Sequence, residues 1–108
     1  MIWSIRSAAM VIACAGLTIP VLAEDSPGAS IFRSNCVICH AGDGSGNTAI
    51  GKKNKVRDLR SPEAQKATDA ELFELISQGK KPMPGFSGRL TDEQIHQVVA
   101  YIRQLAKK

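Results

Sequence analysis

The chain has 108 residues, a formal net charge of +4 at pH 7 and 44% hydrophobic residues. A chain of this length forms one domain and buries only a modest core from its own side chains. It has three cysteines, so it offers no disulfide framework. A basic run at residues 52–60 contains no aromatic residue, which argues against a nucleic-acid partner.

Residues 1–23 have the composition of a secretory signal peptide. Arg6 supplies the positive start, an apolar stretch follows, and Val21-Leu22-Ala23 precedes an acidic segment in the manner of a cleavage site. Cleavage after Ala23 predicts export to the periplasm or an equivalent compartment. The remaining residues, 24–108, would then form a single mature domain.

Two alternatives to a cleaved signal stay open. The apolar stretch could be retained as a membrane anchor, although it is short and Pro20 interrupts it. The segment Val11-Ile12-Ala13-Cys14 resembles a bacterial lipoprotein box, in which the cysteine becomes the lipidated first residue. Lipid at Cys14 would tether the same mature domain to a membrane.

The first helix is expected to begin at Ser26 and Pro27, a serine cap followed by a proline at the first helical position. This helix leads into Cys36-Val37-Ile38-Cys39-His40. C-x-x-C-H is the attachment signature of a c-type haem, because two thiols at this spacing reach both vinyl groups of one porphyrin. Cys36 and Cys39 are therefore the predicted attachment residues, and His40 is the predicted axial ligand of the iron.

Two other chemistries use cysteines at this spacing. A thioredoxin-like redox pair is disfavoured, because no β-branched strand precedes Cys36 as a βαβ unit requires. A zinc site needs four protein ligands, and residues 24–108 offer only Cys36, Cys39, His40 and His96. Joint binding of one zinc ion by the adjacent Cys39 and His40 is awkward. Haem attachment is therefore the preferred interpretation.

The rest of the chain is expected to consist of helices and loops. A glycine-rich loop at residues 41–51 precedes the basic run 52–60, and Ser61-Pro62 starts a short helix. Capping boxes at Thr68 and Thr91 open helices over residues 69–78 and 92–106, each with one apolar face. No segment alternates like a strand, so the sequence predicts an all-α fold.

Met83 is the only methionine outside the signal region, and it lies between Pro82 and Pro84 in a loop at residues 80–88. The two prolines take it off any helical face, so simple core filling is a weak explanation. A thioether is a soft ligand that favours ferrous iron, and Met83 is therefore the predicted sixth ligand. His96 is the alternative, although its place beside the apolar face of the last helix is typical of a surface histidine.

These motifs, in this order, resemble a small class I cytochrome c of the bacterial and photosynthetic short type. The shared segments are Cys36-x-x-Cys39-His40, Met83-Pro84-x-Phe86 and Leu90-Thr91-Asp92-Glu93, followed by Tyr101-Ile102. The resemblance covers residues 24–108 and implies three to five helices wrapped around one covalently bound haem. It also implies terminal helices that cross where small Gly28 meets Tyr101.

One position differs from the family pattern. Many relatives have a proline after the glycine loop, whose carbonyl accepts a hydrogen bond from the ligating histidine. Here Gly51 is followed by Lys52-Lys53-Asn54, and the next proline is Pro62. A carbonyl near residues 50–53 is expected to take this role toward the ring of His40.

The resemblance implies a one-electron carrier between redox proteins, with one haem c and no small-molecule substrate. Two axial ligands leave no open iron position for oxygen or peroxide, which disfavours an enzyme. The basic run, with Lys80 and Lys81, is a candidate surface for an acidic redox partner. The protein is expected to be monomeric. The alternatives are a haem-based ligand-binding or sensor module and a fixed electron-transfer subunit of an oxidase or dehydrogenase complex.

Overall fold

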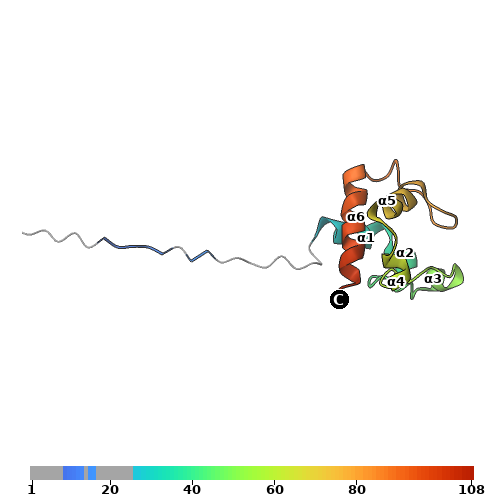
Figure 1. Cartoon of the computed structure of the whole chain (residues 1–108), viewed down its shortest axis with the longest axis horizontal. Coiled ribbons are helices and arrows are strands. Elements are labelled where there is room, and N and C mark those ends of the chain that lie inside the picture. The colour runs from blue at the N-terminus through green and yellow to red at the C-terminus, as the bar shows by residue number, and fades with distance from the viewer. Residues whose placement is uncertain (1–8, 14, 17–25) are drawn as a thin grey trace, which may run out of the picture.

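The computed structural model describes residues 9–13, 15–16 and 26–108. Apart from an isolated bridge between Lys80 and Met83, regular structure in these residues is helical, which confirms the all-α prediction. In Figure 1, α1 crosses α6, and α5 lies beside the N-terminal half of α6. The helices are α1 (Pro27–Asn35), α2 (Val37–His40), α3 (Ala49–Lys53), α4 (Pro62–Gln65), α5 (Asp69–Gln78) and α6 (Asp92–Leu105).

The predicted signal peptide, residues 1–23, lies largely outside the described residues, and so does Cys14. The parts of this segment that are described, residues 9–13 and 15–16, contain no helix. Within the described ranges, none of the helices combines the length and the apolar character needed to cross a membrane.

Side-chain caps start the helices where the sequence predicts them. Thr68 accepts a hydrogen bond from the backbone N–H of Glu71 at 3.1 Å, and the Glu71 carboxylate accepts one from the Thr68 N–H at 3.2 Å. Thr91 and Gln94 repeat this reciprocal pattern at the start of α6. Such caps satisfy N–H groups that have no partner within the helix. Helix α5 ends at Gln78 as predicted, and α6 ends one residue before its predicted end.

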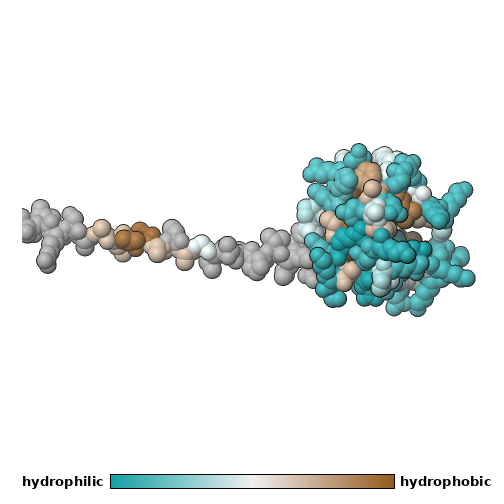
Figure 2. Space-filling view, viewed as in Figure 1, coloured by the Kyte–Doolittle hydropathy of each residue, from teal (hydrophilic) through white to brown (hydrophobic). Residues whose placement is uncertain are grey.

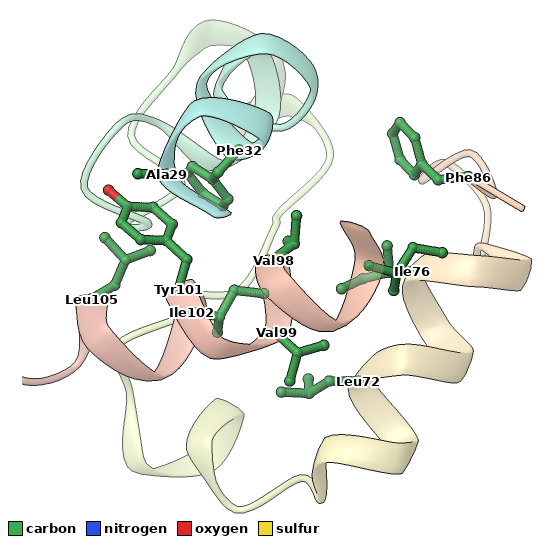
Figure 3. Packing of buried hydrophobic residues seen from close by; sticks show 11 residues of the cluster. Ala29, Phe32, Leu72, Ile76, Phe86, Val98, Val99, Tyr101, Ile102 and Leu105 are labelled. Carbon is green, nitrogen blue, oxygen red and sulfur yellow. The ribbon is translucent and has the colours of Figure 1, made fainter. Parts of the chain in front are cut away.

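Helices α1 and α6 cross at close range because the contact point on α1 has no side chain. A Cβ atom at Gly28 would lie 3.0 Å from Cβ of Tyr101 and would overlap the carbonyl group of Gln97. One turn further along α1, the Phe32 and Tyr101 rings pack with centroids 5.3 Å apart at an angle of 59° (Figure 3). The implied crossing of the terminal helices near Gly28 and Tyr101 is therefore confirmed.

The apolar faces of α1, α5 and α6 form the core. In Figure 3, Leu72 and Ile76 of α5 lie beside Val98 and Val99 of α6. Full burial of one aliphatic or aromatic side chain stabilises a fold by about 1.5–3 kcal/mol, so the α6 stripe is a large contribution in a chain this short. The face of the domain in Figure 2 is largely hydrophilic, with apolar side chains visible in small patches. The buried α6 residues are Ile95, Val98, Val99, Tyr101, Ile102 and Leu105.

One helix lies where the sequence predicts a loop. Helix α3 occupies the end of the expected 41–51 loop and the start of the basic run. Thr48 accounts for this, because its hydroxyl accepts a hydrogen bond from the Gly51 N–H at 2.8 Å. The same hydroxyl lies 2.8 Å from the carbonyl oxygen of Ile38 and 3.1 Å from that of Cys39. The cap that starts α3 therefore also joins it to α2, a tertiary contact that loop composition does not reveal.

Candidate haem site

All four predicted site residues line one cavity of about 470 Å³. Cys36, Cys39 and His40 reach it from the junction of α1 and α2, and Met83 reaches it from the loop between α5 and α6. His40 and Met83 also border a smaller cavity of about 60 Å³ against α6. The larger volume is typical of a cofactor pocket. The fold therefore brings together residues that lie far apart in the sequence.

The cavity has apolar walls and a charged rim. Three stretches of chain supply the walls, with the side chains of Val56, Leu59, Ala64, Ala67, Leu72 and Leu75. Four exposed cations, Lys55, Arg57, Lys80 and Lys81, also border the cavity. Such a site accepts a large apolar group and leaves positive charge where the cavity meets solvent.

The single turn of α2 sets the relative positions of the motif residues. The N–H of His40 donates to the carbonyl of Cys36 at 3.0 Å, and the N–H of Cys39 donates to the same carbonyl at 3.3 Å. Residues three and four apart on a helix lie on one face, so Cys36, Cys39 and His40 can all reach the same cavity. Both thiols are half-buried and free of a disulfide.

Burial shifts the pKa of both kinds of motif side chain. It lowers the pKa of His40, which favours the neutral imidazole that binds metal ions. Burial, followed by repulsion from Cys39, raises the pKa of the Cys36 thiol to about 11. In the folded chain without a bonded group, Cys36 is therefore a neutral thiol at pH 7.

The ring of His40 has one buried nitrogen, Nδ1, without a hydrogen-bond partner among the described residues. Of the expected acceptors near residues 50–53, the carbonyl of Ile50 accepts from Asn54 N–H and that of Gly51 accepts from Val56 N–H. The expected hydrogen bond from the His40 ring to a carbonyl of this segment is therefore not found among the described residues.

The Met83 loop is built on the backbone of α5. The N–H of Phe86 donates to the carbonyl of Ile76 at 2.9 Å, and the next N–H donates to the carbonyl of Ser77 at 3.0 Å. The loop also folds closely onto the end of α5, where Gly79 has a φ of +76° and a Cβ atom would lie 2.8 Å from the Met83 carbonyl. A left-handed backbone with no room for a side chain accounts for the glycine at this position.

His96 does not reach the cavity. Its ring is on the exposed side of α6 and stacks on Phe73, with centroids 4.5 Å apart and an angle of 27°. Neither ring borders the cavity that contains His40 and Met83. In the part of the chain that the structure describes, no three His, Cys, Asp or Glu residues cluster as metal ligands, so the zinc alternative has no support.

Sequence reasoning missed one wall of the cavity. Leu59 was counted in the basic run and residues 61–67 were given no role beyond a short helix, yet Leu59, Ala64 and Ala67 all border the cavity. The available signal was weak: two small apolar residues three positions apart, after the helix start at Ser61-Pro62.

Comparison with known proteins identifies the family to which this chain is similar. A family model described as cytochrome c oxidase, cbb3-type, subunit III matches residues 23–102. Cytochrome c6 of Thermosynechococcus vestitus is 39% identical over 93 residues, which are 85% of this chain and 80% of that protein. Cytochrome c6 of a Nostoc species is 42% identical over 84 residues, which are 77% of this chain and 73% of that protein.

The solved structures that superpose on this chain are also c-type cytochromes. The KustC0563 c-type cytochrome superposes with a TM-score of 0.68 at 29% identity, covering 72% of this chain and 95% of that one. Cytochrome c6 from the diatom Phaeodactylum tricornutum superposes with a TM-score of 0.59 at 32% identity, covering 75% of this chain and 92% of that one.

The helical fold and the C-x-x-C-H cavity define a c-type cytochrome. The chain belongs to the cytochrome c family, as a small class I member that carries one covalently attached haem c. The residues present fit that group, because two thiols, an imidazole and a thioether share one apolar cavity. Its similarity to cytochrome c6 over most of both chains indicates a monohaem electron carrier.

Proposed function

We propose that this protein carries single electrons between redox proteins outside the cytoplasmic membrane. Cys36 and Cys39 would hold the haem through thioether bonds, and His40 and Met83 would bind its iron. One observation carries the proposal: these four side chains border one cavity. The bound haem supplies an iron that alternates between the ferrous and ferric states.

The two ligands have different parts in this function. His40 enters as a neutral imidazole, since burial lowers its pKa. Met83 supplies a thioether, which favours ferrous iron and raises the reduction potential. With both positions filled by the chain, no site is left for a small-molecule substrate, so the protein exchanges electrons and is not an enzyme.

The rim of the cavity supports an acidic redox partner. Lys55, Arg57, Lys80 and Lys81 border the cavity where it meets solvent. Like charges gathered at one opening raise the local potential and steer an oppositely charged partner to it. Electrons would then enter and leave by this side of the molecule.

The carbon monoxide affinity of the reduced protein tests this function against a haem-based sensor. An electron carrier with Met83 on the iron binds carbon monoxide poorly and shows a near-infrared sulfur-to-iron band when oxidised. Rapid carbon monoxide binding by the wild type, together with no such band at neutral pH, would favour the ligand-binding module.

A fixed subunit of a larger complex is the second candidate, and the name of the matching family model favours it, since that model describes an oxidase subunit. The cytochrome c6 relatives match over most of their length and favour the separate carrier. Purification from the native cells, with the soluble fraction and the detergent-extracted membranes both examined, distinguishes the two. A carrier elutes alone as a monomer, whereas a subunit elutes with an oxidase or dehydrogenase.

Export through a cleaved signal peptide is the remaining part of the proposal. Residues 1–23 are removed after Ala23, and the mature domain of residues 24–108 acts in the periplasm or an equivalent compartment. The intact mass of the native protein tests this. A mass that begins at Glu24 with one haem supports it, and a mass that begins at Cys14 with acyl chains contradicts it.

A further inference from the structure

Arg103, on α6, makes an unusually complete set of contacts for a side chain that is 25% exposed. Its Nε donates to Asp69 Oδ1 at 3.0 Å, and its two terminal nitrogens make four more hydrogen bonds. Their acceptors are the backbone carbonyls of Gln65 and Ala67, the Gln65 side chain and the Asp69 carboxylate. Every nitrogen of the planar guanidinium is therefore used, in a fork that lysine cannot reproduce.

Gln65 completes this arrangement from the other side. Its Nε2 donates to the carbonyl of Leu59 at 2.7 Å and to the carbonyl of Ile102 at 3.2 Å. Its Oε1 accepts from Arg103 at 3.1 Å. We call this pair of side chains, Arg103 and Gln65, the Arg103–Gln65 clamp. The clamp connects the last turn of α6 to three backbone carbonyls of the segment 59–67.

The segment that the clamp holds is one wall of the cavity. It supplies Leu59, Ala64 and Ala67 to the cavity surface, and Ala64 is buried. Helix α4 within it is a single turn, so it has few backbone hydrogen bonds of its own. Hydrogen bonds from α6 therefore hold this segment in place, whereas the longer helices are held by apolar packing.

We propose that Arg103 is a positioning residue for electron transfer. Through Gln65 and the backbone carbonyls that it binds, it holds the segment 59–67 in place as a wall of the haem cavity. This inference rests on the proposed function, since it takes that cavity as the haem site. A firmly held apolar wall excludes water and favours ferrous iron, which has one positive charge fewer than ferric iron. Release of the wall exposes carbonyl groups that recruit water, and the reduction potential falls.

The test measures the reduction potential of the haem-loaded protein. Arg103→Met removes the fork and the charge, and Arg103→Lys keeps the charge but cannot make the five hydrogen bonds. Both variants are expected to shift the electron-exchange equilibrium toward the ferric state by about threefold, or roughly 28 mV at 59 mV per tenfold change. Lys107→Met is the matched control, because it removes one exposed positive charge just after α6 and leaves the five hydrogen bonds of Arg103 in place; its potential is expected to match that of the wild type.

Two results overturn the inference. An unchanged potential in both Arg103 variants, with a lower melting temperature, makes the clamp a purely structural feature. A potential that falls in Arg103→Met alone assigns the effect to the charge. The near-infrared band of Met83 is expected to persist in all variants, since none of the clamp's hydrogen bonds involves the Met83 loop.

Hydrogen exchange on the wild type covers the case in which the Arg103 variants do not fold. The amides of Gln65 and Lys66, which bond within α4 at 2.9 and 3.0 Å, are expected to exchange as slowly as those of α6. Exchange at the rate of an exposed loop overturns the inference. A protein that loses its haem on denaturation contradicts the proposed function instead, and this extraction is a separate experiment from the exchange measurement on the haem-loaded protein.

Discussion

Lys80 and Met83 exchange two backbone hydrogen bonds. The N–H of Lys80 donates to the carbonyl of Met83 at 3.1 Å, and the N–H of Met83 donates to the carbonyl of Lys80 at 2.8 Å. This closed turn, with Pro82 inside it, orders the loop without a helix or a sheet. The half-buried Met83 side chain is thereby held at the cavity by its own backbone.

Replacement of Met83 tests this arrangement. Met83→Ala is expected to open the sixth position of the iron and admit carbon monoxide. Because the soft ligand is lost, the reduction potential should fall, and the electron-exchange equilibrium should shift toward the ferric state by at least about tenfold. Met83→His is the control: it should stay six-coordinate and still have a lower potential. Spectroelectrochemical titration measures both. A wild-type potential in Met83→Ala would show that the sulfur is not a ligand.

Local sequence signals account for most of this fold. The reciprocal caps at Thr68 and Thr91 need only residues within one helical turn, and both appear where expected. The four predicted site residues come from the local patterns C-x-x-C-H and a methionine between two prolines, and all four border one cavity. Helix α3 was missed because its cap, Thr48, is anchored on carbonyls of residues 38 and 39. The contacts between Arg103 and Gln65 were missed for the same reason, since they join residues distant in the sequence.

The crossing of α1 and α6 depends on the absence of a side chain at Gly28. Gly28→Ala places a methyl group against the Gln97 carbonyl, so the helices must move apart. The expected loss is about 1–3 kcal/mol in the free energy of unfolding, the usual range for overpacking. Gly42→Ala is the matched control, because nothing lies within 4 Å of a Cβ atom there, and its effect is expected to stay within about 0.5 kcal/mol. Denaturant unfolding of both variants measures this. Equal stabilities would contradict the close crossing.

Charge at the cavity rim is expected to control the rate of electron exchange. Oxidation by anionic ferricyanide should slow as salt is added, and oxidation by cationic tris(phenanthroline)cobalt(III) should speed up. Lys55→Gln with Lys80→Gln should lower the ferricyanide rate about twofold to tenfold at low ionic strength. Lys107→Gln, which does not border the cavity, is the control and should leave the rate near that of the wild type. If the stopped-flow oxidation rates do not change with ionic strength for either reagent, the charged rim does not steer the redox partner.

An exposed ion pair makes a small part of the stability depend on pH. The Arg60 side chain donates to both carboxylate oxygens of Asp58, at 3.0 and 3.1 Å, and its backbone N–H donates at 2.9 Å. These bonds, the side-chain ones first, hold the pKa of Asp58 below its usual range. A lowered pKa in the folded state stabilises the fold above the unfolded pKa, near 3.9, and this contribution is lost as the pH falls through the folded value.

Asp58→Asn should therefore lower the melting temperature slightly at pH 7, and the difference from the wild type should shrink as the pH falls below about 4. Arg60→Gln should show the same trend, and the double variant should show less than the sum of the two effects. Thermal melts between pH 2.5 and 7, values roughly bracketing the carboxylate range, provide the measurement. If the difference in melting temperature between variant and wild type stays constant over this range, the ionised pair does not contribute to the stability.

The central claim is that Cys36 and Cys39 bond one haem covalently, and acid-acetone extraction of the denatured protein tests it most directly. We expect the colour to stay with the polypeptide and the intact mass to equal that of the chain plus one haem. Cys36→Ala and Cys39→Ala should each leave a single link and give less haem-loaded protein. Haem that extracts freely from the wild type, leaving a chain of apoprotein mass, would contradict the account.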